Sequence, residues 1–283
     1  MTDINKKTKM CYVVLCAAGE SRRFLQHWQT HHPELPCPSN KLLAPLLGKA
    51  LVRYAFSQIA SLQQYMTATD SGYALGGVCI VTHTAISSAL ENFARLELTQ
   101  VPLVFAEGGS SRQASVWAGL QALKQSFATD IATTQTSYVV VHDAARPLMD
   151  TETLMACITY LHTHPDYHGC CVGNPAVDTL KHVTLSSSQG ATIQHTPARE
   201  TLWQVQTPQV FQASSLWQAH ESAHTHQDFN STDDMQLLEN YLPHGKQHIL
   251  HSPKPNPKVT YPYDLAFCET LLKSQPPLEN SSG

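Results

Sequence analysis

The stretch Tyr12-Val-Val-Leu-Cys-Ala-Ala-Gly-Glu-Ser-Arg-Arg-Phe24 indicates the fold class of this chain. Its first residues are apolar and partly β-branched, as expected for a strand covered on both faces of a parallel sheet. Small residues follow, and their backbone N–H groups can approach an anion closely: Ala17, Ala18 and Gly19. The positive charges nearby are those of Arg22, Arg23 and, further on, Lys41. The stretch predicts a strand that ends in a phosphate-binding loop, and an ordinary βα turn with solvated arginines is the alternative.

A second strand-end loop follows Phe105 and contains the pair Gly108-Gly109. Ser110 or Ser111 is expected to cap the next helix, because a serine hydroxyl can accept a hydrogen bond from a free backbone N–H of the first turn. The apolar residues of that helix recur at helical spacing: Val116, Leu120 and Leu123.

Charged residues end the next predicted strand. The β-branched run from Tyr138 stops at Asp143, and Arg146 follows closely. This places a carboxylate and a guanidinium at the carboxyl edge of a parallel sheet, where α/β proteins bind their ligands. Further along, Lys258-Val-Thr260 precedes a helix whose apolar residues are Leu265, Cys268 and Leu272.

Short strand-like runs alternate with helical runs along the chain, which is typical of an α/β fold with a mostly parallel sheet and helices on both faces. We expect one domain over residues 1–273, with a projecting β-hairpin arm at about residues 178–206, and a disordered tail over residues 274–283.

The periodicity also predicts individual elements. Leu51, Ala55, Ile59 and Leu62 indicate a helix, residues 77–81 a strand, and residues 154–161 a helix capped by Asp150 or Thr151. Two polar, aperiodic segments are predicted to be loops: residues 25–39, as a flexible lid before Lys41, and residues 63–73.

The composition limits the class of protein. A net charge of −4 over 283 residues gives no field for nucleic acid or an acidic membrane. The first apolar run is too short for a signal peptide or a membrane span, so we expect a cytoplasmic protein. The 8 cysteines contain no Cys-x-x-Cys pair, which favours buried free thiols in a reducing compartment.

Together these blocks resemble the cytidylyltransferase family of the non-mevalonate isoprenoid pathway, from about Tyr12 to Leu272. The blocks that carry the resemblance are Ala17-Ala-Gly19 with Arg22-Arg23, Gly108-Gly109 with Arg112 and Ser115, Val141-His-Asp-Ala-Ala-Arg-Pro147, Pro175-Ala-Val-Asp-Thr179, Leu202-Trp203 with Thr207-Pro-Gln209, Thr232-Asp233, and Lys258-Val-Thr260. The resemblance implies a Rossmann-like nucleotidyltransferase sheet.

It also implies a reaction, the transfer of CMP from CTP to 2-C-methyl-D-erythritol 4-phosphate. The acceptor phosphate attacks the α-phosphorus in line, giving 4-diphosphocytidyl-2-C-methyl-D-erythritol and diphosphate. A phosphate dianion is an adequate nucleophile, so the protein needs cations and positioning rather than a nucleophile of its own. Ribitol 5-phosphate is the alternative acceptor, because its cytidylyltransferases share the Ala-Ala-Gly and His-Asp-Ala-Ala-Arg-Pro blocks.

The resemblance assigns roles residue by residue. Transition-state stabilisation falls to Arg23 and Lys41. CTP binding falls to Ala17, Ala18, Gly19, Gly109, Ser110 and Ser115. Acceptor binding falls to Asp143, Arg146, Thr179, Arg199, Thr232 and Lys258, with Arg199 reaching in from the arm of a homodimer partner. Mg²⁺ is expected to be held mainly by the CTP phosphates, with Asp143 as a candidate ligand.

The sequence departs from the family pattern at three places. Ser110 stands where an Asp usually follows the Gly-Gly pair. Lys41 follows Asn40 after a longer insertion, rather than following Pro in a short loop. The usual Thr-Arg-Pro-Glu-Asp block is Thr260-Tyr-Pro-Tyr-Asp264, which removes a charge near the phosphate anchor.

Alternatives remain at the level of single residues and of function. Thr232 also suits a helix N-cap, Thr179 could be only a strand residue, and Arg199 and Lys258 could be ordinary surface residues. His220-Glu-Ser-Ala-His224 has the spacing of a zinc metalloprotease motif, but its neighbours are polar and 16 histidines make a chance match unsurprising. A non-catalytic CTP-binding protein is the third alternative.

Overall fold

The central element is a seven-stranded sheet with strand order β11-β7-β10-β6-β1-β4-β5. A computed structural model describes residues 8–69, 71–127, 131–132, 137–186 and 190–274. The strands of the sheet are β1 (Lys9–Ala17), β4 (Tyr73–Thr82), β5 (Leu103–Glu107), β6 (Tyr138–Asp143), β7 (Tyr167–Pro175), β10 (Trp203–Gln212) and β11 (Lys246–His251). Only β10 runs antiparallel to its neighbours, which confirms the mostly parallel sheet.

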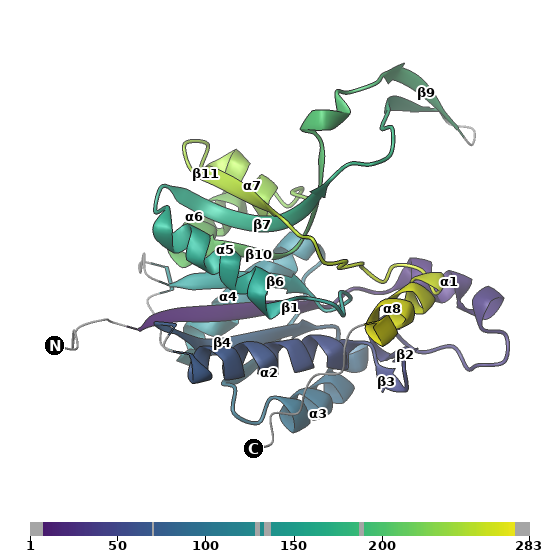
Figure 1. Cartoon of the computed structure of the whole chain (residues 1–283), viewed down its shortest axis with the longest axis horizontal. Helices are drawn as coiled ribbons and strands as arrows, with labels where there is room; N and C mark the ends of the chain where they lie inside the picture. Colours follow the sequence, from purple (N-terminus) through teal and green to yellow (C-terminus); the bar gives the residue numbers. More distant parts are fainter. Residues whose placement is uncertain (1–7, 70, 128–130, 133–136, 187–189, 275–283) are drawn as a thin grey trace.

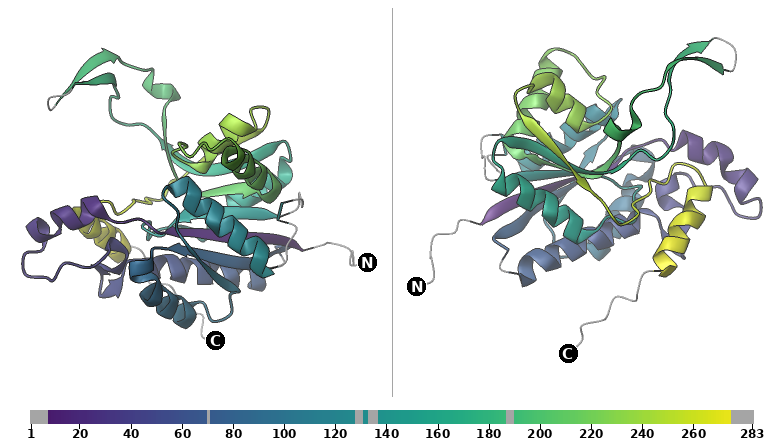
Figure 2. Two further views of the ribbon diagram at one scale, coloured as in Figure 1. Left: turned by 180° about the vertical axis from the view of Figure 1, so that it is seen from behind. Right: turned by 45° about the horizontal axis from the view of Figure 1, so that its top comes forward.

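Helices cover both faces of this sheet (Figures 1 and 2). The helices are α1 (Arg22–His31), α2 (Val52–Ala68), α3 (Ser87–Glu97), α4 (Arg112–Phe127), α5 (Thr151–Thr163), α6 (Ala213–Thr225), α7 (Asp234–Tyr241) and α8 (Tyr263–Ser274). One apolar core joins the sheet to α2, α3 and α5, and the other joins it to α4, α6 and α7. No helix within the described ranges is long and apolar enough to cross a membrane.

The alternation of side chains along β1 supplies both cores. Val13 and Leu15 belong to the first core, whereas Tyr12 and Val14 belong to the second. All four are at most 2% exposed. Successive residues of a strand point to opposite faces, so a run without polar residues is what a doubly covered strand requires. The apolar run from Tyr12 to Leu15 therefore lies at the centre of the fold.

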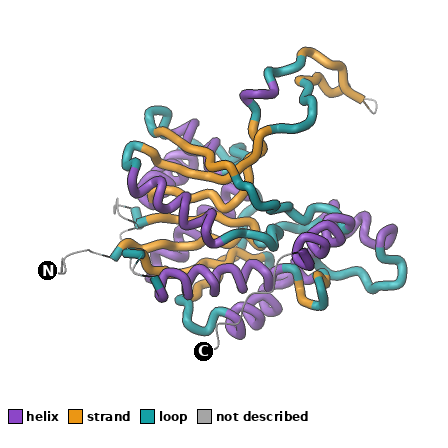
Figure 3. The backbone as a smooth tube through the Cα atoms, viewed as in Figure 1, coloured by secondary structure: helices purple, strands orange, loops and turns teal. Residues whose placement is uncertain are grey.

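A hairpin of β8 (His182–Ser186) and β9 (Gly190–His195) projects away from the sheet at the end of two extended segments (Figures 1 and 3). It confirms the predicted β-arm. The described residues of both strands are exposed, including Leu185 at 81% and Ile193 at 61%. The short 3₁₀ turn η3 (Arg199–Thr201) lies on the returning segment.

Two segments predicted to be loops are partly helical. Helix α1 continues to His31 because Phe24 and Trp28, one turn apart, are both buried at 1% exposure. Helix α2 continues to Ala68 because Met66 extends the buried stripe of Ile59 and Leu62. The predicted lid at residues 25–39 is therefore wrong in its first half, and the predicted loop at residues 63–73 is wrong up to residue 68.

The remaining local predictions agree closely with the structure. The strand predicted at residues 77–81 is part of β4, and α5 is capped by Asp150, whose side chain accepts from the Thr153 N–H. Asp233, rather than Thr232, caps α7. Ser274, predicted to begin a disordered tail, is the last residue of α8, and residues 275–283 lie outside the described part of the chain.

Candidate active site

A cleft of about 900 Å³ opens at the carboxyl ends of β1, β5 and β6. Segments from distant parts of the sequence meet there, because parallel strands end at the same edge of the sheet. Ten of the residues predicted from the sequence line this cleft: Ala17, Ala18, Gly19, Arg23, Lys41, Gly109, Ser110, Ser115, Asp143 and Lys258. The structure therefore brings the predicted phosphate loop, the Gly-Gly turn and the strand-end charges together.

The loop after β1 is tied to Lys41 by Asn40. The Asn40 amide donates to the Gly19 carbonyl at 2.9 Å, and its side-chain oxygen accepts from the Ser21 hydroxyl at 2.9 Å. Ser21 in turn accepts from the Lys41 N–H at 3.2 Å. These bonds hold Ser21 in a left-handed conformation, with φ of 62°, that a serine rarely adopts. Asn40, only 4% exposed, thus fixes the position of the Lys41 backbone despite the long insertion before it.

Lys41 begins the 3₁₀ turn η1 (Lys41–Leu43) and reaches across the cleft. Its Nζ donates to the Val259 carbonyl at 2.7 Å, next to Lys258. Burial, the Lys258 charge and the Arg23 charge lower the pKa of Lys41 to about 8, against the weaker opposing effect of Asp143 and Asp264. An incoming polyanion would favour the protonated ammonium. Arg53, the next arginine after Arg23 in the sequence, lies outside the cleft lining and pairs with Glu97.

The Gly-Gly turn lies directly against the phosphate loop. A Cβ added at Gly108 would come 2.2 Å from the Cβ of Ala18, so any larger residue would force the two loops apart. The Gly109 N–H donates to the Ser115 hydroxyl at 3.1 Å, and Ser115 donates to the Ser111 carbonyl at 2.9 Å. Ser111 is the residue that caps α4, since its hydroxyl accepts from the Ala114 N–H.

Asp143 lies at the floor of the cleft among three cations. Lys258 Nζ is 2.7 Å from its Oδ2, Arg146 Nε is 3.7 Å from Oδ2, and Arg112 Nε is 3.8 Å from Oδ1. Burial raises the pKa of Asp143, but Lys258, Arg112 and Arg146 outweigh it and hold the pKa well below its usual range. Asp143 is therefore an anion, and both of its oxygens face positive groups.

Four of the predicted residues do not line the cleft. Arg146 lies outside the cleft lining, where it pairs with Asp143 and donates to the Asn256 carbonyl at 2.7 Å. Thr179 and Arg199 are exposed on the arm, where Arg199 donates to the Val177 carbonyl at 2.9 Å. Thr232 is exposed, and its hydroxyl donates to the Gln236 side chain at 3.0 Å. Their predicted contacts with an acceptor remain predictions.

Sequence reasoning gave no site role to Arg112 or Asp234. Arg112 lines the cleft, and its Nη1 is 2.6 Å from Oδ2 of Asp234, which starts α7 more than a hundred residues later. The place of Arg112 in the Gly108-Gly109 block was the only signal for it. The pairing with Asp234 has no local signature.

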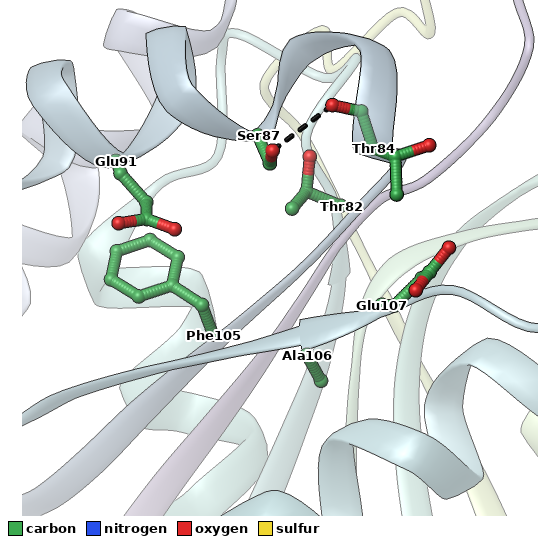
Figure 4. Close-up of a pocket in the computed structure, with 7 residues that line it drawn as sticks. All are labelled: Thr82, Thr84, Ser87, Glu91, Phe105, Ala106 and Glu107. Atoms are coloured by element: carbon green, nitrogen blue, oxygen red, sulfur yellow. Dashed lines mark hydrogen bonds between the residues drawn. The ribbon is translucent and has the colours of Figure 1, made fainter.

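A smaller cavity of about 220 Å³ lies beside the cleft, between the ends of β4 and β5 and the start of α3 (Figure 4). Figure 4 shows the Glu91 carboxylate beside the Phe105 ring, and the Ser87 hydroxyl bonded to the Thr84 carbonyl at 3.0 Å. Within the described ranges its lining contains Glu91 and Glu107 but no Lys or Arg. It is therefore unsuited to bind a phosphate.

The His-Glu-x-x-His motif lies on α6, away from the cleft lining. His220 is 2% exposed and bonded to Asp234, whereas His224 is exposed. Among the residues that can be described, no group of three His, Cys, Asp or Glu side chains could hold a metal ion. His220 is already bonded to Asp234, so the described residues give this motif no zinc site.

The fold and the cationic cleft define an α/β protein of the nucleotidyltransferase class. Residues 11–274 match the family model for 2-C-methyl-D-erythritol 4-phosphate cytidylyltransferase. The chain belongs to this family.

Similar proteins carry the same name. A relative from Acaryochloris marina is 34% identical over 265 residues, which cover 93% of this chain and 94% of that protein. A relative from a Synechococcus strain is 31% identical over 236 residues, which cover 83% of this chain and 90% of that protein. Both are named 2-C-methyl-D-erythritol 4-phosphate cytidylyltransferase.

Solved structures show the same fold. The 4-diphosphocytidyl-2C-methyl-D-erythritol synthase of Anaerococcus prevotii superposes with a TM-score of 0.67 at 19% identity, covering 94% of this chain and 99% of that one. The Francisella tularensis 2-C-methyl-D-erythritol 4-phosphate cytidylyltransferase gives a TM-score of 0.65 at 20% identity, covering 92% and 99%. At these identities the likeness concerns the fold alone.

Proposed function

We propose that this protein transfers CMP from CTP to 2-C-methyl-D-erythritol 4-phosphate, with release of diphosphate. Family membership and the names of its relatives support the substrates. The observation that carries the proposal for this chain is the convergence of Arg23, Lys41 and Lys258 on one cleft. Cations from three distant segments are what two polyanions need in order to approach each other.

In this proposal, the loop after β1 and the Gly-Gly turn bind the nucleotide through backbone N–H groups and through Ser110 and Ser115. Arg23 and Lys41 lie on the triphosphate and stabilise the charge that develops as the acceptor oxygen attacks the α-phosphorus. Lys258 holds the acceptor phosphate while Asp143 orients Lys258. No protein nucleophile is required, so positioning and charge supply the rate enhancement.

Asp143 is poorly placed to bind Mg²⁺ directly, because the cationic groups of Lys258, Arg112 and Arg146 already lie next to its carboxylate oxygens. We propose that Mg²⁺ enters chelated by the triphosphate, as part of the nucleotide substrate.

A homodimer would complete the site. The arm exposes Val177, Leu185 and Ile193 by 61% or more, and two isolated strands are marginally stable in water. Packing against a second copy would cover these side chains and could bring the partner's arm, with the residues equivalent to Thr179 and Arg199, to the acceptor. Thr232 and Arg146 are proposed to contribute to acceptor binding from the same chain.

The cysteines support a cytoplasmic location. All 8 are free, and burial raises the pKa of several of them, for instance that of Cys11 to about 12. Such thiols are inert in a reducing compartment. Cys37 is exposed, against the expectation of buried thiols throughout.

The test is diphosphate release with CTP and Mg²⁺, measured with 2-C-methyl-D-erythritol 4-phosphate, with ribitol 5-phosphate and with no acceptor. We expect release only with the methylerythritol compound. Preferential turnover of ribitol 5-phosphate would reassign the acceptor. Tight CTP binding with no release for either acceptor would identify a non-catalytic nucleotide-binding protein.

A further inference from the structure

A buried chain of polar groups leads from the floor of the cleft to α6. Arg112 lies between two carboxylates, with Nε facing Asp143 and Nη1 paired to Asp234 at 2.6 Å. Oδ1 of Asp234 accepts from His220 Nε2 at 2.9 Å. Asp234 and His220 are only 1% and 2% exposed, so solvent screens the interactions between these polar groups little.

His220 decides how Asp234 can bind Arg112. A guanidinium and a carboxylate left alone favour a bidentate pair with two parallel hydrogen bonds. Here His220 occupies one carboxylate oxygen, so Arg112 pairs with Asp234 through the other oxygen only. The Nη2 atom of Arg112 is buried and has no hydrogen-bond partner among the residues that the structure describes. Arg112 therefore stays turned toward Asp143 and the cleft.

The surroundings of His220 hold its ring in this position. The ring stacks on Trp117 of α4, with centroids 6.0 Å apart and planes at 8°. Gln113, the next residue after Arg112, donates to the Asp228 carbonyl at 2.7 Å and accepts from the Ser231 N–H at 3.2 Å. The first turn of α4 is thus fixed to the segment that leads into α7.

We propose that His220 is a positioning residue for acceptor binding: by occupying one oxygen of Asp234, it keeps Arg112 directed at Asp143 and the acceptor. The inference rests on the proposed function, since it assigns this role within the transfer reaction. It also gives a purpose to the first histidine of the His-Glu-x-x-His motif, which the proposed reaction does not otherwise use.

The kinetic test compares three variants of the full-length protein. His220→Leu removes the donor, so Asp234 can turn and chelate Arg112 with both oxygens. We expect the KM for the acceptor to rise about tenfold, the effect of misplacing one hydrogen bond between charged groups. The KM for CTP should stay within about twofold. His220→Gln keeps an N–H donor and should recover most of the acceptor KM.

His224→Gln is the matched control, because His224 lies one turn further along the same helix and is exposed. It should behave as the wild type. An unchanged acceptor KM in His220→Leu would overturn the proposal. So would a His220→Gln protein as impaired as His220→Leu, which would reveal a packing role only.

A measurement without substrate separates this inference from the proposed function. The ¹⁵N side-chain signal of Arg112 Nε, assigned by its loss in Arg112→Lys, should shift in His220→Leu and stay in place in His224→Gln. An unmoved signal in His220→Leu would overturn the role of His220 even if the enzyme is active. Failure of the wild type to release diphosphate would instead count against the function alone.

Discussion

The cleft and the arm differ in how far one chain completes them. In the cleft, Asp143 faces three cations of its own chain, and Asn40 fixes the loop that leads to Lys41. On the arm, Leu185 and Ile193 face solvent, and Arg199 contacts the backbone of its own arm. The cleft is therefore preorganised within one chain, whereas the arm leaves large apolar side chains exposed.

The largest effect should come from removing a cation of the cleft. Arg23→Ala and Lys41→Met should each lower kcat by about two powers of ten or more, the range for loss of one preorganised donor to developing negative charge. Single-turnover kinetics with CTP and acceptor would measure this. Near-normal turnover of Lys41→Met would show that Lys41 does not act on the phosphates.

The pH dependence should follow the lowered pKa of Lys41. Because that pKa is about 8, kcat/KM for CTP in the free enzyme should fall about tenfold per pH unit above pH 8, as the ammonium loses its proton. In Lys41→Arg, kcat/KM for CTP should not decrease above pH 8, because a guanidinium keeps its charge throughout the accessible pH range. A wild-type profile that stays flat well above pH 8 would contradict the assignment.

A test of the arm mixes two impaired proteins and assays them at an acceptor concentration well below the wild-type KM. Arg199→Ala should raise the acceptor KM about tenfold in the proposed dimer, as expected for loss of one charge-assisted contact. Mixing it with Lys258→Ala after reversible dissociation should restore about a quarter of wild-type activity, because half of the random dimers then hold one intact site out of two. No gain on mixing, or a fully active Arg199→Ala monomer, would show that each chain works alone.

The smallest effect concerns stability. The folded-state pKa of Lys41 lies below its ordinary value of 10.5, so between about pH 8 and 10.5 the unfolded chain binds a proton that the folded chain has lost. Stability of the wild type should therefore rise relative to Lys41→Met across that window, by on the order of 2 kcal/mol. Urea unfolding of both proteins at each pH would measure the difference, and a constant difference would contradict the burial of a charged amine.

The sequence predicted the parts of the site that depend on local patterns. The strand-end positions of Gly19, Gly109 and Asp143 follow from where apolar runs stop, and the structure places all three at the cleft. The loop predictions failed where a helix buries few residues. Phe24 and Trp28 are the two buried residues of α1, and the polar glutamines at positions 63 and 64 interrupt the apolar pattern of α2.

What could not be predicted are pairings between distant segments. Arg112 with Asp234, and Lys258 with Asp143, are joined only because the sheet brings their strands and helices to one edge. The reach of Lys41 to the Val259 carbonyl is of the same kind. Periodicity carries no information about which charges will meet, although the family resemblance did name Lys41, Asp143 and Lys258 as candidates.

The hydrogen bonds of Asn40 have a consequence for how this chain can vary. They connect the two ends of the segment between the phosphate loop and Lys41, through Gly19 and Ser21 at one end and Leu42 at the other. The residues between these ends therefore form a segment whose two ends are held together. Insertions or deletions in this segment therefore need not displace Lys41. The exposed Cys37 lies in this segment and is accordingly an attachment point for a spectroscopic label on an otherwise intact enzyme.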